Sequence, residues 1–236
     1  MKCIGLIGGL SWESTIVYYK LINELVREQI GGLHSADCLV YSFDFAEIEA
    51  LQVSGRWEEA TERMIAVAKR LERGGADFLL ICSNTMHKMA AQVQASVSIP
   101  LLHLADATAE LITAQGITKI GLLGTRFTME EDFYKGRLTS KYGLDVIVPD
   151  AEERQLVNRV IYDELCQGVI DLESKQGYIA IMDRLVEAGA QGIILGCTEI
   201  TLLVNQNDAT VPLFDTTAIH AEVAVEYALR AEEIRS

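Results

Sequence analysis

The chain has no excess of positive charge: its 20 Lys and Arg stand against 34 Asp and Glu, for a formal net charge of −14. Because nucleic-acid binding relies on clustered Lys and Arg that neutralise phosphates, this balance argues against DNA or RNA as a partner. No apolar run approaches the length of a transmembrane helix. Two glycines and a polar stretch at residues 8–14 also interrupt the apolar start before it could act as a signal peptide. We therefore expect a cytoplasmic protein that binds neither nucleic acid nor membrane.

Paired cysteines, nucleotide-binding motifs and metal-ligand spacings are also missing. The five cysteines are odd in number and have no close pairing, which is typical of free thiols in a reducing compartment. The Gly-rich turn at residues 8–9 lacks the spacing of a dinucleotide fingerprint or a phosphate-binding loop, so nucleotide binding is disfavoured. His34, His103 and His220 form no metal-like spacing with one another or with the cysteines. We expect no metal site.

An apolar run near the C-terminus carries the first functional signal. The sequence GIILGCTE at 192–199 is bounded by glycine and predicts a buried parallel strand. Its end opens onto Cys197, Thr198 and Glu199. Because open α/β sheets place their chemistry at the carboxyl edge of the strands, these three residues are candidates for a functional site.

The chain contains this strand and its preceding helix twice, and the two copies align without a gap. The alignment matches Arg70 with Arg184, Leu71 with Leu185, Ala76 with Ala190, Ser83 with Cys197, and Cys82 with Gly196. The thiol of the second copy therefore falls opposite a hydroxyl in the first, and a cysteine lies one residue earlier. This mismatch is the main question that the sequence poses.

A further repeat extends the duplication to the whole chain. The sequence IGLIG at 4–8 is answered by IGLLG at 120–124. Strands that alternate with helices in both halves predict an α/β fold of two pseudo-symmetric, doubly wound parallel-sheet lobes with the active site between them. We assign residues 1–105 plus 216–236 to the N-terminal lobe and 106–215 to the C-terminal lobe. No linker rich in Pro, Gly or Ser separates them.

Several expected elements border the candidate site. They are a first helix with Ile16, Tyr19, Ile22, Leu25 and Val26 on one apolar face, a polar segment at 44–57, a fourth strand at 100–104, helices over 152–168 and 174–188, and a final helix over 216–234.

Two facing groups at equivalent strand ends suit racemisation without a cofactor. One group removes the α-proton of a small molecule, and the other returns a proton from the opposite face. Cysteine fits this task because a nearby helix N-terminus easily lowers its pKa from about 8.5. Backbone N–H groups at the strand ends could bind an α-carboxylate. Side-chain donors for the same purpose are Asn84, Thr85, Thr125 and Thr198.

Four motifs resemble a known family. The sequences ICSNTMHK at 81–88 and ILGCTEI at 194–200 resemble the two signatures of the aspartate/glutamate racemases. GGLSWEST at 8–15 and LGTRFTM at 123–129 resemble its branch of bacterial L-aspartate/glutamate-specific racemases. The resemblance spans nearly the whole chain. It implies two pseudo-symmetric lobes, a homodimer, an acidic amino-acid substrate and activity without pyridoxal phosphate or metal.

The first signature departs from the family pattern. Most members have Cys directly before Asn-Thr, whereas this chain has Ser83 there and Cys82 one residue earlier. Successive strand side chains point to opposite faces, so Cys82 should not simply replace Ser83. We predict asymmetric chemistry, in which the Cys197 thiolate abstracts from one enantiomer, the L form by analogy, and Ser83 serves the other face inefficiently. The rival hypothesis makes Cys82 the second base.

The group that binds the distal carboxylate is open. Gln52 lies where family members place such a contact, and Arg126 and Lys88 are charged alternatives. Backbone groups of Leu10 and Ser11 are expected to line the pocket.

Two further residues have more than one interpretation. Glu199 either tunes Cys197 or is an acidic first-turn residue that the helix dipole favours, so Thr198 is the better substrate contact. His87 either contacts substrate or makes a hydrogen bond within the protein.

Two other functions remain possible for this sequence. The scaffold could support a decarboxylase or isomerase of small diacids that works with one cysteine. It could also be a non-catalytic amino-acid sensor that has lost one base.

Overall fold

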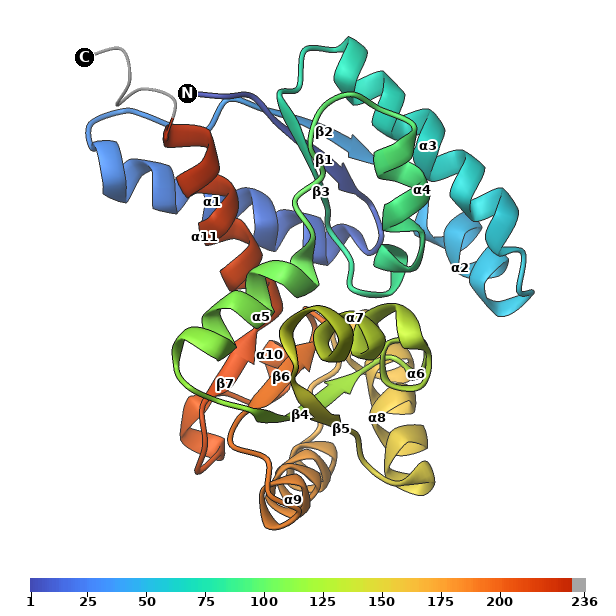
Figure 1. Cartoon of the computed structure of the whole chain (residues 1–236). Helices are drawn as coiled ribbons and strands as arrows, with labels where there is room; N and C mark the ends of the chain where they lie inside the picture. Colours follow the sequence, from blue (N-terminus) through green and yellow to red (C-terminus); the bar gives the residue numbers. More distant parts are fainter. Residues whose placement is uncertain (231–236) are drawn as a thin grey trace. The chain divides into compact units, whose positions relative to one another are not determined.

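The computed structural model describes residues 1–230 and divides into two compact units (Figure 1). The first unit comprises Met1–Leu104 and the segment that begins at His220. The second unit comprises Ala105–Ile219. Each unit is built around its own parallel sheet.

The first unit has a three-stranded sheet in the order β2-β1-β3, and both strand pairs are parallel. Its elements are β1 (Ile4–Gly8), α1 (Trp12–Ile30), β2 (Cys38–Ser42), α2 (Phe45–Val53), α3 (Trp57–Arg73), β3 (Phe78–Ile81), the 3-10 helix η1 (Thr85–Met89) and α4 (Ala90–Ala95). Helix α11 (Thr216–Leu229) joins this unit from His220 onward.

Alternate strand residues of the first unit enter two hydrophobic clusters, one on each face of the sheet. Leu6 and Leu80 pack with residues of α1 and α11, whereas Ile7 and Leu79 pack with residues of α2, α3 and α4. This follows from the two-residue period of a strand, which sends neighbouring side chains to opposite faces.

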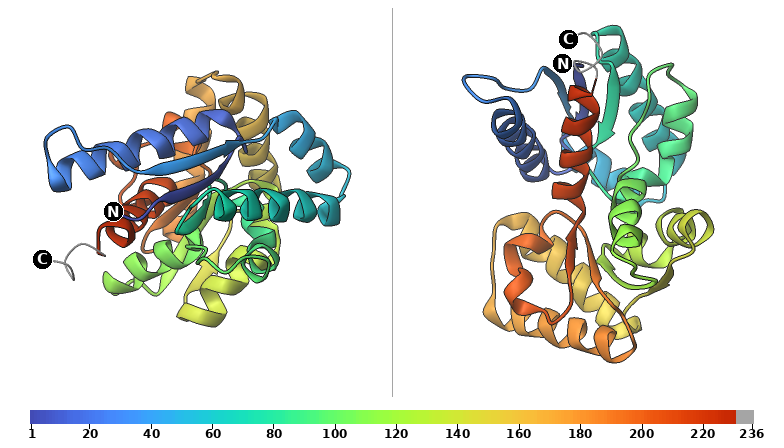
Figure 2. Two further views of the ribbon diagram at one scale, coloured as in Figure 1. Left: turned by 90° about the horizontal axis from the view of Figure 1, so that it is seen from above. Right: turned by 60° about the vertical axis from the view of Figure 1, so that its left-hand side comes forward.

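The second unit has a four-stranded parallel sheet in the order β5-β4-β6-β7. Its elements are α5 (Leu104–Ala114), β4 (Lys119–Gly124), α6 (Arg126–Glu130), α7 (Asp132–Tyr142), β5 (Asp145–Ile147), α8 (Ala151–Asp163), η2 (Leu165–Gln167), α9 (Leu172–Glu187), β6 (Ile193–Gly196), α10 (Ile200–Leu203), η3 (Gln206–Asp208) and β7 (Leu213–Asp215). Figure 2 gives two further views of these helices and strands.

The duplication that the sequence predicts is confirmed in three dimensions. The order β2-β1-β3 corresponds to β5-β4-β6, with helices flanking each sheet. Leu79 N–H donates to Pro100 O at 2.8 Å, and its aligned partner Ile193 donates to Pro212 O at 2.9 Å. The α/β class with two doubly wound parallel-sheet units is therefore correct.

The predicted fourth strand at 100–104 is wrong. Only an isolated parallel bridge joins Leu79 to Leu101. Pro100 has no N–H, and the chain turns into α5 at Leu104, whose N–H donates to a ring nitrogen of His87 instead of to a strand. The ladder therefore ends after one bridge.

The polar segment predicted at 44–57 contains a helix. Asp44 accepts a hydrogen bond from the backbone N–H of Ala46 and caps α2. Ile48, Leu51 and Gln52 form the buried side of this helix. Its Ala, Glu, Leu and Gln residues are good helix formers, so the acidic composition concealed a helical segment.

Helix α1 buries a different face from the predicted one. Ile22 and Val26 are buried as expected, but Ile16 and Tyr19 are about half exposed, at 53 % and 52 %. The small polar residues Ser14 and Thr15 take their place on the buried side. Their hydroxyl groups make hydrogen bonds at the strand ends, which apolar side chains could not make.

The later helices also differ in length from the prediction. The helix expected over 152–168 ends at Asp163 and is followed by η2, and the next helix begins at Leu172. Helix α11 ends at Leu229, and the rest of the range predicted for it, 231–234, lies outside the described residues. Across residues 1–230, no helix has the length and apolar character that crossing a membrane requires.

Candidate functional site

Buried polar side chains gather where the parallel strands of each unit end. β1 pairs with β3, and β4 pairs with β6, so the ends of each pair lie at one sheet edge. The eight residues predicted to bind substrate are only 4–8 % exposed. They are Leu10, Ser11, Gln52, Asn84, Thr85, Thr125, Thr198 and Glu199. Buried polar groups need hydrogen-bond partners and are frequent at functional sites.

Ser83 lies just beyond the end of β3 and is partly exposed, whereas the residues on both sides of it are buried. Its hydroxyl accepts a long hydrogen bond, 3.4 Å, from the backbone N–H of Met86. This bond uses a lone pair of Oγ, so the hydroxyl proton stays available to another acceptor. Ser83 is therefore placed at the sheet edge with a donor group.

Cys82 lies in the core instead. It is fully buried and belongs to the same hydrophobic cluster as Tyr18 and Phe78. Burial raises the pKa of its thiol well above the usual range, because the low-dielectric surroundings disfavour the thiolate. The backbone hydrogen bond from Cys82 N–H to Ile7 O, 3.0 Å, continues the strand pairing and keeps this side chain on the core face.

The turn after β1 completes the edge of the first sheet. Gly9 has a φ of +70°, and a Cβ there would lie 2.1 Å from the backbone nitrogen of Phe43, so only glycine fits. Ser11 then caps α1 by accepting a hydrogen bond from Ser14 N–H at 3.3 Å. Leu10 packs in the same core cluster as Met86. Leu10 and Ser11 are thus tied to the segment that follows Ser83.

Gln52 reaches the same segment from α2. Its side-chain amide donates to the Met86 sulfur at 3.1 Å. A thioether is a weak acceptor, so a stronger anionic acceptor could take its place. Of the two charged alternatives, Lys88 stacks over the Trp57 ring at 4.0 Å, and Arg126 is exposed over the Phe127 ring at 5.4 Å.

The edge of the second sheet repeats this arrangement. Thr125 follows β4 and caps α6 by accepting from Thr128 N–H at 3.4 Å, as Ser11 caps α1. Thr198 follows β6, and its hydroxyl lies 3.1 Å from the hydroxyl of Thr217 in α11. Both threonines are held by contacts within their own unit.

Cys197 forms a hydrogen-bonded pair with Glu199. The thiol donates to Oε2 of the carboxylate, with Sγ and Oε2 2.9 Å apart. Burial and, second, the negative charge of Glu199 raise the pKa of this thiol well above its usual range. The thiol is therefore protonated at neutral pH, and Glu199 lies where it can take the proton.

Ser83 and Cys197 occupy equivalent positions in the two units, each partly exposed between buried neighbours. Cys197 is the one partly exposed residue within 192–200, a range that the structure describes completely. Gly196, aligned with Cys82, has no room for a side chain because a Cβ would lie 2.7 Å from Leu123 O. The register inferred from the sequence thus agrees with the burial pattern of both strand ends.

Sequence reasoning missed two hydroxyl groups at these edges. Ser14 donates to Cys82 O at 3.3 Å, and Thr217 meets Thr198. Both lie in the first turn of the helix that follows a strand, where polar residues can reach the strand ends. A polar residue at this position was the signal by which the sequence could have revealed them. His87, whose role was open, donates from Nδ1 to Ser83 O at 2.7 Å.

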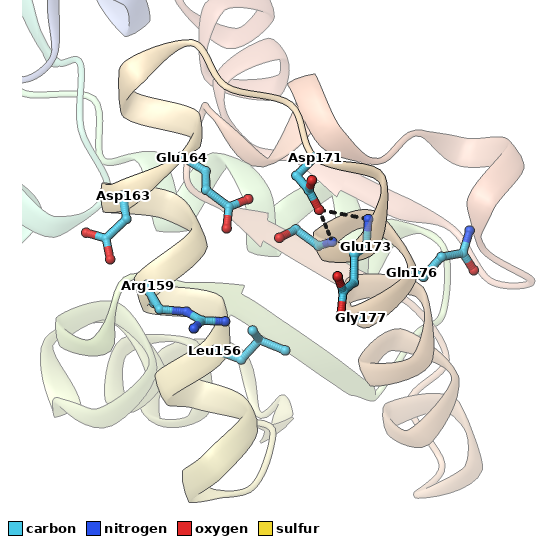
Figure 3. A pocket seen from close by; sticks show the side chains of 9 residues that line it. Leu156, Arg159, Asp163, Glu164, Asp171, Glu173, Gln176 and Gly177 are labelled. Atoms are coloured by element: carbon cyan, nitrogen blue, oxygen red, sulfur yellow. Dashed lines mark hydrogen bonds between the residues drawn. The ribbon is translucent and has the colours of Figure 1, made fainter.

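The structure also contains a cavity of about 790 Å³ between α8 and α9 (Figure 3). Asp163, Glu164, Asp171 and Glu173 make its lining acidic, with Arg159 as a cation. None of the predicted site residues lines it. Within residues 1–230, no three His, Cys, Asp or Glu side chains are grouped so that they could hold a metal ion.

Comparison with solved structures shows similarity over nearly the whole chain. A crystal structure of a putative Asp/Glu racemase from Yersinia pestis is 57 % identical, with a TM-score of 0.92 over 97 % of this chain and 100 % of that one. PH1733, an aspartate racemase homologue from Pyrococcus horikoshii OT3, is 39 % identical, with a TM-score of 0.84 over 97 % and 99 % of the two chains.

Curated sequences lead to the same group of proteins. The broad specificity amino-acid racemase RacX of Bacillus subtilis (strain 168) is 24 % identical over 225 residues, which cover 94 % of this chain and 96 % of RacX. The family described as Asp/Glu/hydantoin racemase matches residues 7–224. With the repeated units and paired strand-end motifs, this match shows that the chain belongs to the Asp/Glu/hydantoin racemase family.

Proposed function

We propose that this protein is a racemase of aspartate or glutamate that works without a cofactor. The observation that carries the proposal is the equivalence of Ser83 and Cys197, each a partly exposed proton-bearing group at the same strand end of a repeated unit. Family membership supports amino-acid racemisation. Similarity to the putative Asp/Glu racemase of Yersinia pestis and to the aspartate racemase homologue of Pyrococcus horikoshii supports an acidic substrate.

In the first step, Glu199 accepts the Cys197 thiol proton and exposes the thiolate. The hydrogen bond between the two groups provides the path for this proton. The thiolate then removes the α-proton: the Cα–H bond breaks, an S–H bond forms, and the electron pair stays on Cα, delocalised into the α-carboxylate. Because an α-hydrogen is weakly acidic, donors to that carboxylate must stabilise the developing charge.

In the second step, a proton reaches Cα from the opposite face. Ser83 gives up its hydroxyl proton as the Cα–H bond forms, and a water molecule returns a proton to the Ser83 oxygen. Glu199 releases the proton that it took from Cys197 to solvent, so every group regains its starting protonation state. A serine hydroxyl is a poor base, so the reverse abstraction by Ser83 is slow, and the enzyme runs well from only one enantiomer. We assign the L form to Cys197 by analogy with the family.

The remaining residues of the two strand-end motifs bind the substrate. Asn84, Thr85, Thr125 and Thr198 supply donors for the α-carboxylate. Gln52 is proposed for the distal carboxylate, because its amide donates to the Met86 thioether, a weak acceptor that a carboxylate could replace.

Hydrogen exchange at Cα tests this function directly. Each enantiomer of aspartate and of glutamate is incubated with the protein in D2O, and loss of the Cα–H signal is followed by NMR. We expect fast exchange from one enantiomer, slow exchange from the other, and loss of the fast exchange in Cys197→Ser. Absence of exchange from all four substrates would refute the racemase proposal.

The same assay separates Ser83 from Cys82 as the group on the second face. Ser83→Ala should abolish the slow exchange, whereas Cys82→Ala should keep it within about threefold of the wild type, because Cys82 is fully buried in the core. The opposite result would make Cys82 the second base.

A single-cysteine decarboxylase is the second candidate, favoured by serine in place of a second catalytic cysteine. It would release CO2 from a malonate-type substrate and exchange no amino-acid α-proton. A sensor would instead bind L-aspartate saturably without either reaction.

A further inference from the structure

His87 is a buried imidazole with both ring nitrogens engaged. It is 3 % exposed and lies one helical turn after Ser83, in η1. Nδ1 lies 2.7 Å from Ser83 O, and Nε2 accepts from Leu104 N–H at 3.2 Å. A carbonyl can only accept and an amide N–H can only donate. These two partners therefore fix His87 as the neutral tautomer with its proton on Nδ1.

A second buried histidine supports this arrangement. His220 Nε2 lies 3.0 Å from Leu102 O and must donate to it, so Nδ1 accepts from the Tyr18 hydroxyl at 2.9 Å. The ring centroid of His220 is 5.9 Å from that of His87, and the centroid of the tilted His103 ring is 4.6 Å from that of His87. A packed ring cluster of this kind restricts rotation of the His87 side chain.

The hydrogen bond from His87 holds the backbone of Ser83, the residue proposed to serve the second face of the substrate. Ser83 O accepts from His87, and the preceding carbonyl, Cys82 O, accepts from Ser14 Oγ at 3.3 Å. Two side chains from different helices therefore hold the two successive peptide groups at the end of β3. The direction of the Ser83 hydroxyl depends on that backbone.

The second unit has no corresponding imidazole at the equivalent position. The residue four positions after Cys197 is Thr201, whose hydroxyl donates to Thr198 O at 2.8 Å. Cys197 is instead paired through its own side chain with Glu199. The two proposed catalytic residues are thus held differently: Ser83 through its backbone carbonyl, and Cys197 through its thiol.

We propose that His87 is a positioning residue for Ser83, because its Nδ1–H holds the Ser83 carbonyl and so aims the hydroxyl at the second face of the substrate. The inference rests on the proposed racemase function. It requires a neutral hydrogen-bond donor at the Nδ1 position and no proton transfer by His87 itself. Asparagine places its side-chain N–H near the Nδ1 position, whereas glutamine places it near Nε2.

The test compares His87→Asn, His87→Gln and His87→Leu in the D2O exchange assay, with each enantiomer measured separately. We expect His87→Leu and His87→Gln to lower exchange from the slow, Ser83-served enantiomer about 10- to 100-fold. Exchange from the fast enantiomer should stay within about threefold, and His87→Asn should retain both. If His87→Leu does not fold, the comparison of Asn with Gln decides.

Three results would overturn the inference. Equal loss from both enantiomers would indicate a purely structural role, unchanged exchange would indicate no role, and failure of Asn to differ from Gln would exclude a donor at Nδ1. Absence of Cα–H exchange in the wild-type protein would instead refute the racemase function. Failure of the His87 inference is therefore distinguishable from failure of the proposed function.

Discussion

The Cys197 thiol and the Glu199 carboxylate lie 2.9 Å apart, and the thiol donates the hydrogen bond between them. The carboxylate therefore has two opposing effects. Its negative charge raises the pKa of the thiol, which disfavours the thiolate, and its basic oxygen offers a destination for the thiol proton. The backbone N–H of Glu199 opposes the first effect, because it donates to the sulfur and lowers the pKa. A neutral replacement separates these effects.

Glu199→Gln should make Cys197 easier to ionise and yet less active. Removing the charge lowers the thiol pKa, so the pH midpoint of alkylation by iodoacetamide should move down. Losing the proton acceptor should reduce Cα–H exchange about 10²- to 10⁴-fold. The exposed Glu187→Gln serves as the control and should change neither quantity. Retained exchange in Glu199→Gln would show that this carboxylate does not receive the proton.

Alkaline pH should destabilise the protein through Cys82. Its folded-state pKa is raised by burial, whereas the pKa of an unfolded thiol is about 8.5. Above that pH the unfolded chain loses a proton that the folded chain keeps, so the free energy of unfolding falls by about 1.4 kcal/mol per pH unit for this group. Urea denaturation at a series of pH values measures this dependence. Cys82→Ala should reduce the slope of the unfolding free energy against pH by this amount. Val93→Ala, a core replacement without a titrating group, should shift the curve but keep its slope.

Acid should destabilise the protein through His220. Its pKa is lowered to about 3 by burial and, second, by the neighbouring His87. As the pH falls below about 6.5, the unfolded histidine binds a proton that the folded one excludes, and stability falls by about 1.4 kcal/mol per pH unit. His220→Gln keeps a donor for Leu102 O and should flatten this dependence between pH 6.5 and 4. The exposed His34→Gln should leave it unchanged; equal slopes in all three proteins would contradict the prediction.

The two faces of α1 should respond differently to truncation. Ile22→Ala removes a fully buried side chain and should lower the free energy of unfolding by about 2–5 kcal/mol. Ile16→Ala, on the same helix but about half exposed, should change it by no more than about 0.5 kcal/mol. Denaturant unfolding of the two variants measures both values. Similar losses would show that Ile16 belongs to the buried face after all.

The strand framework could be predicted because its signals are local or repeated. Short apolar runs mark β1, β3, β4 and β6, and the duplication supplies an independent check on each pair. The hydrophobicity pattern predicted neither helix α2 nor the buried face of α1, and the reason is the same for both. In both, tertiary contacts bury polar residues such as Gln52 and Ser14, and a hydrophobicity pattern cannot anticipate a polar core position.

The sequence by itself determined the repeat, the family resemblance and the alignment of Ser83 with Cys197, because these depend only on residue order. The tertiary structure decided where the side chains lie. It placed Cys82 in the core and Ser83 at the sheet edge, and it brought the Glu199 carboxylate to the Cys197 thiol. It also connected His87 to the Ser83 carbonyl and fixed its tautomer through Leu104, which lies 17 positions away in the chain. Hydrogen bonds between distant residues depend on packing that residue spacing does not encode.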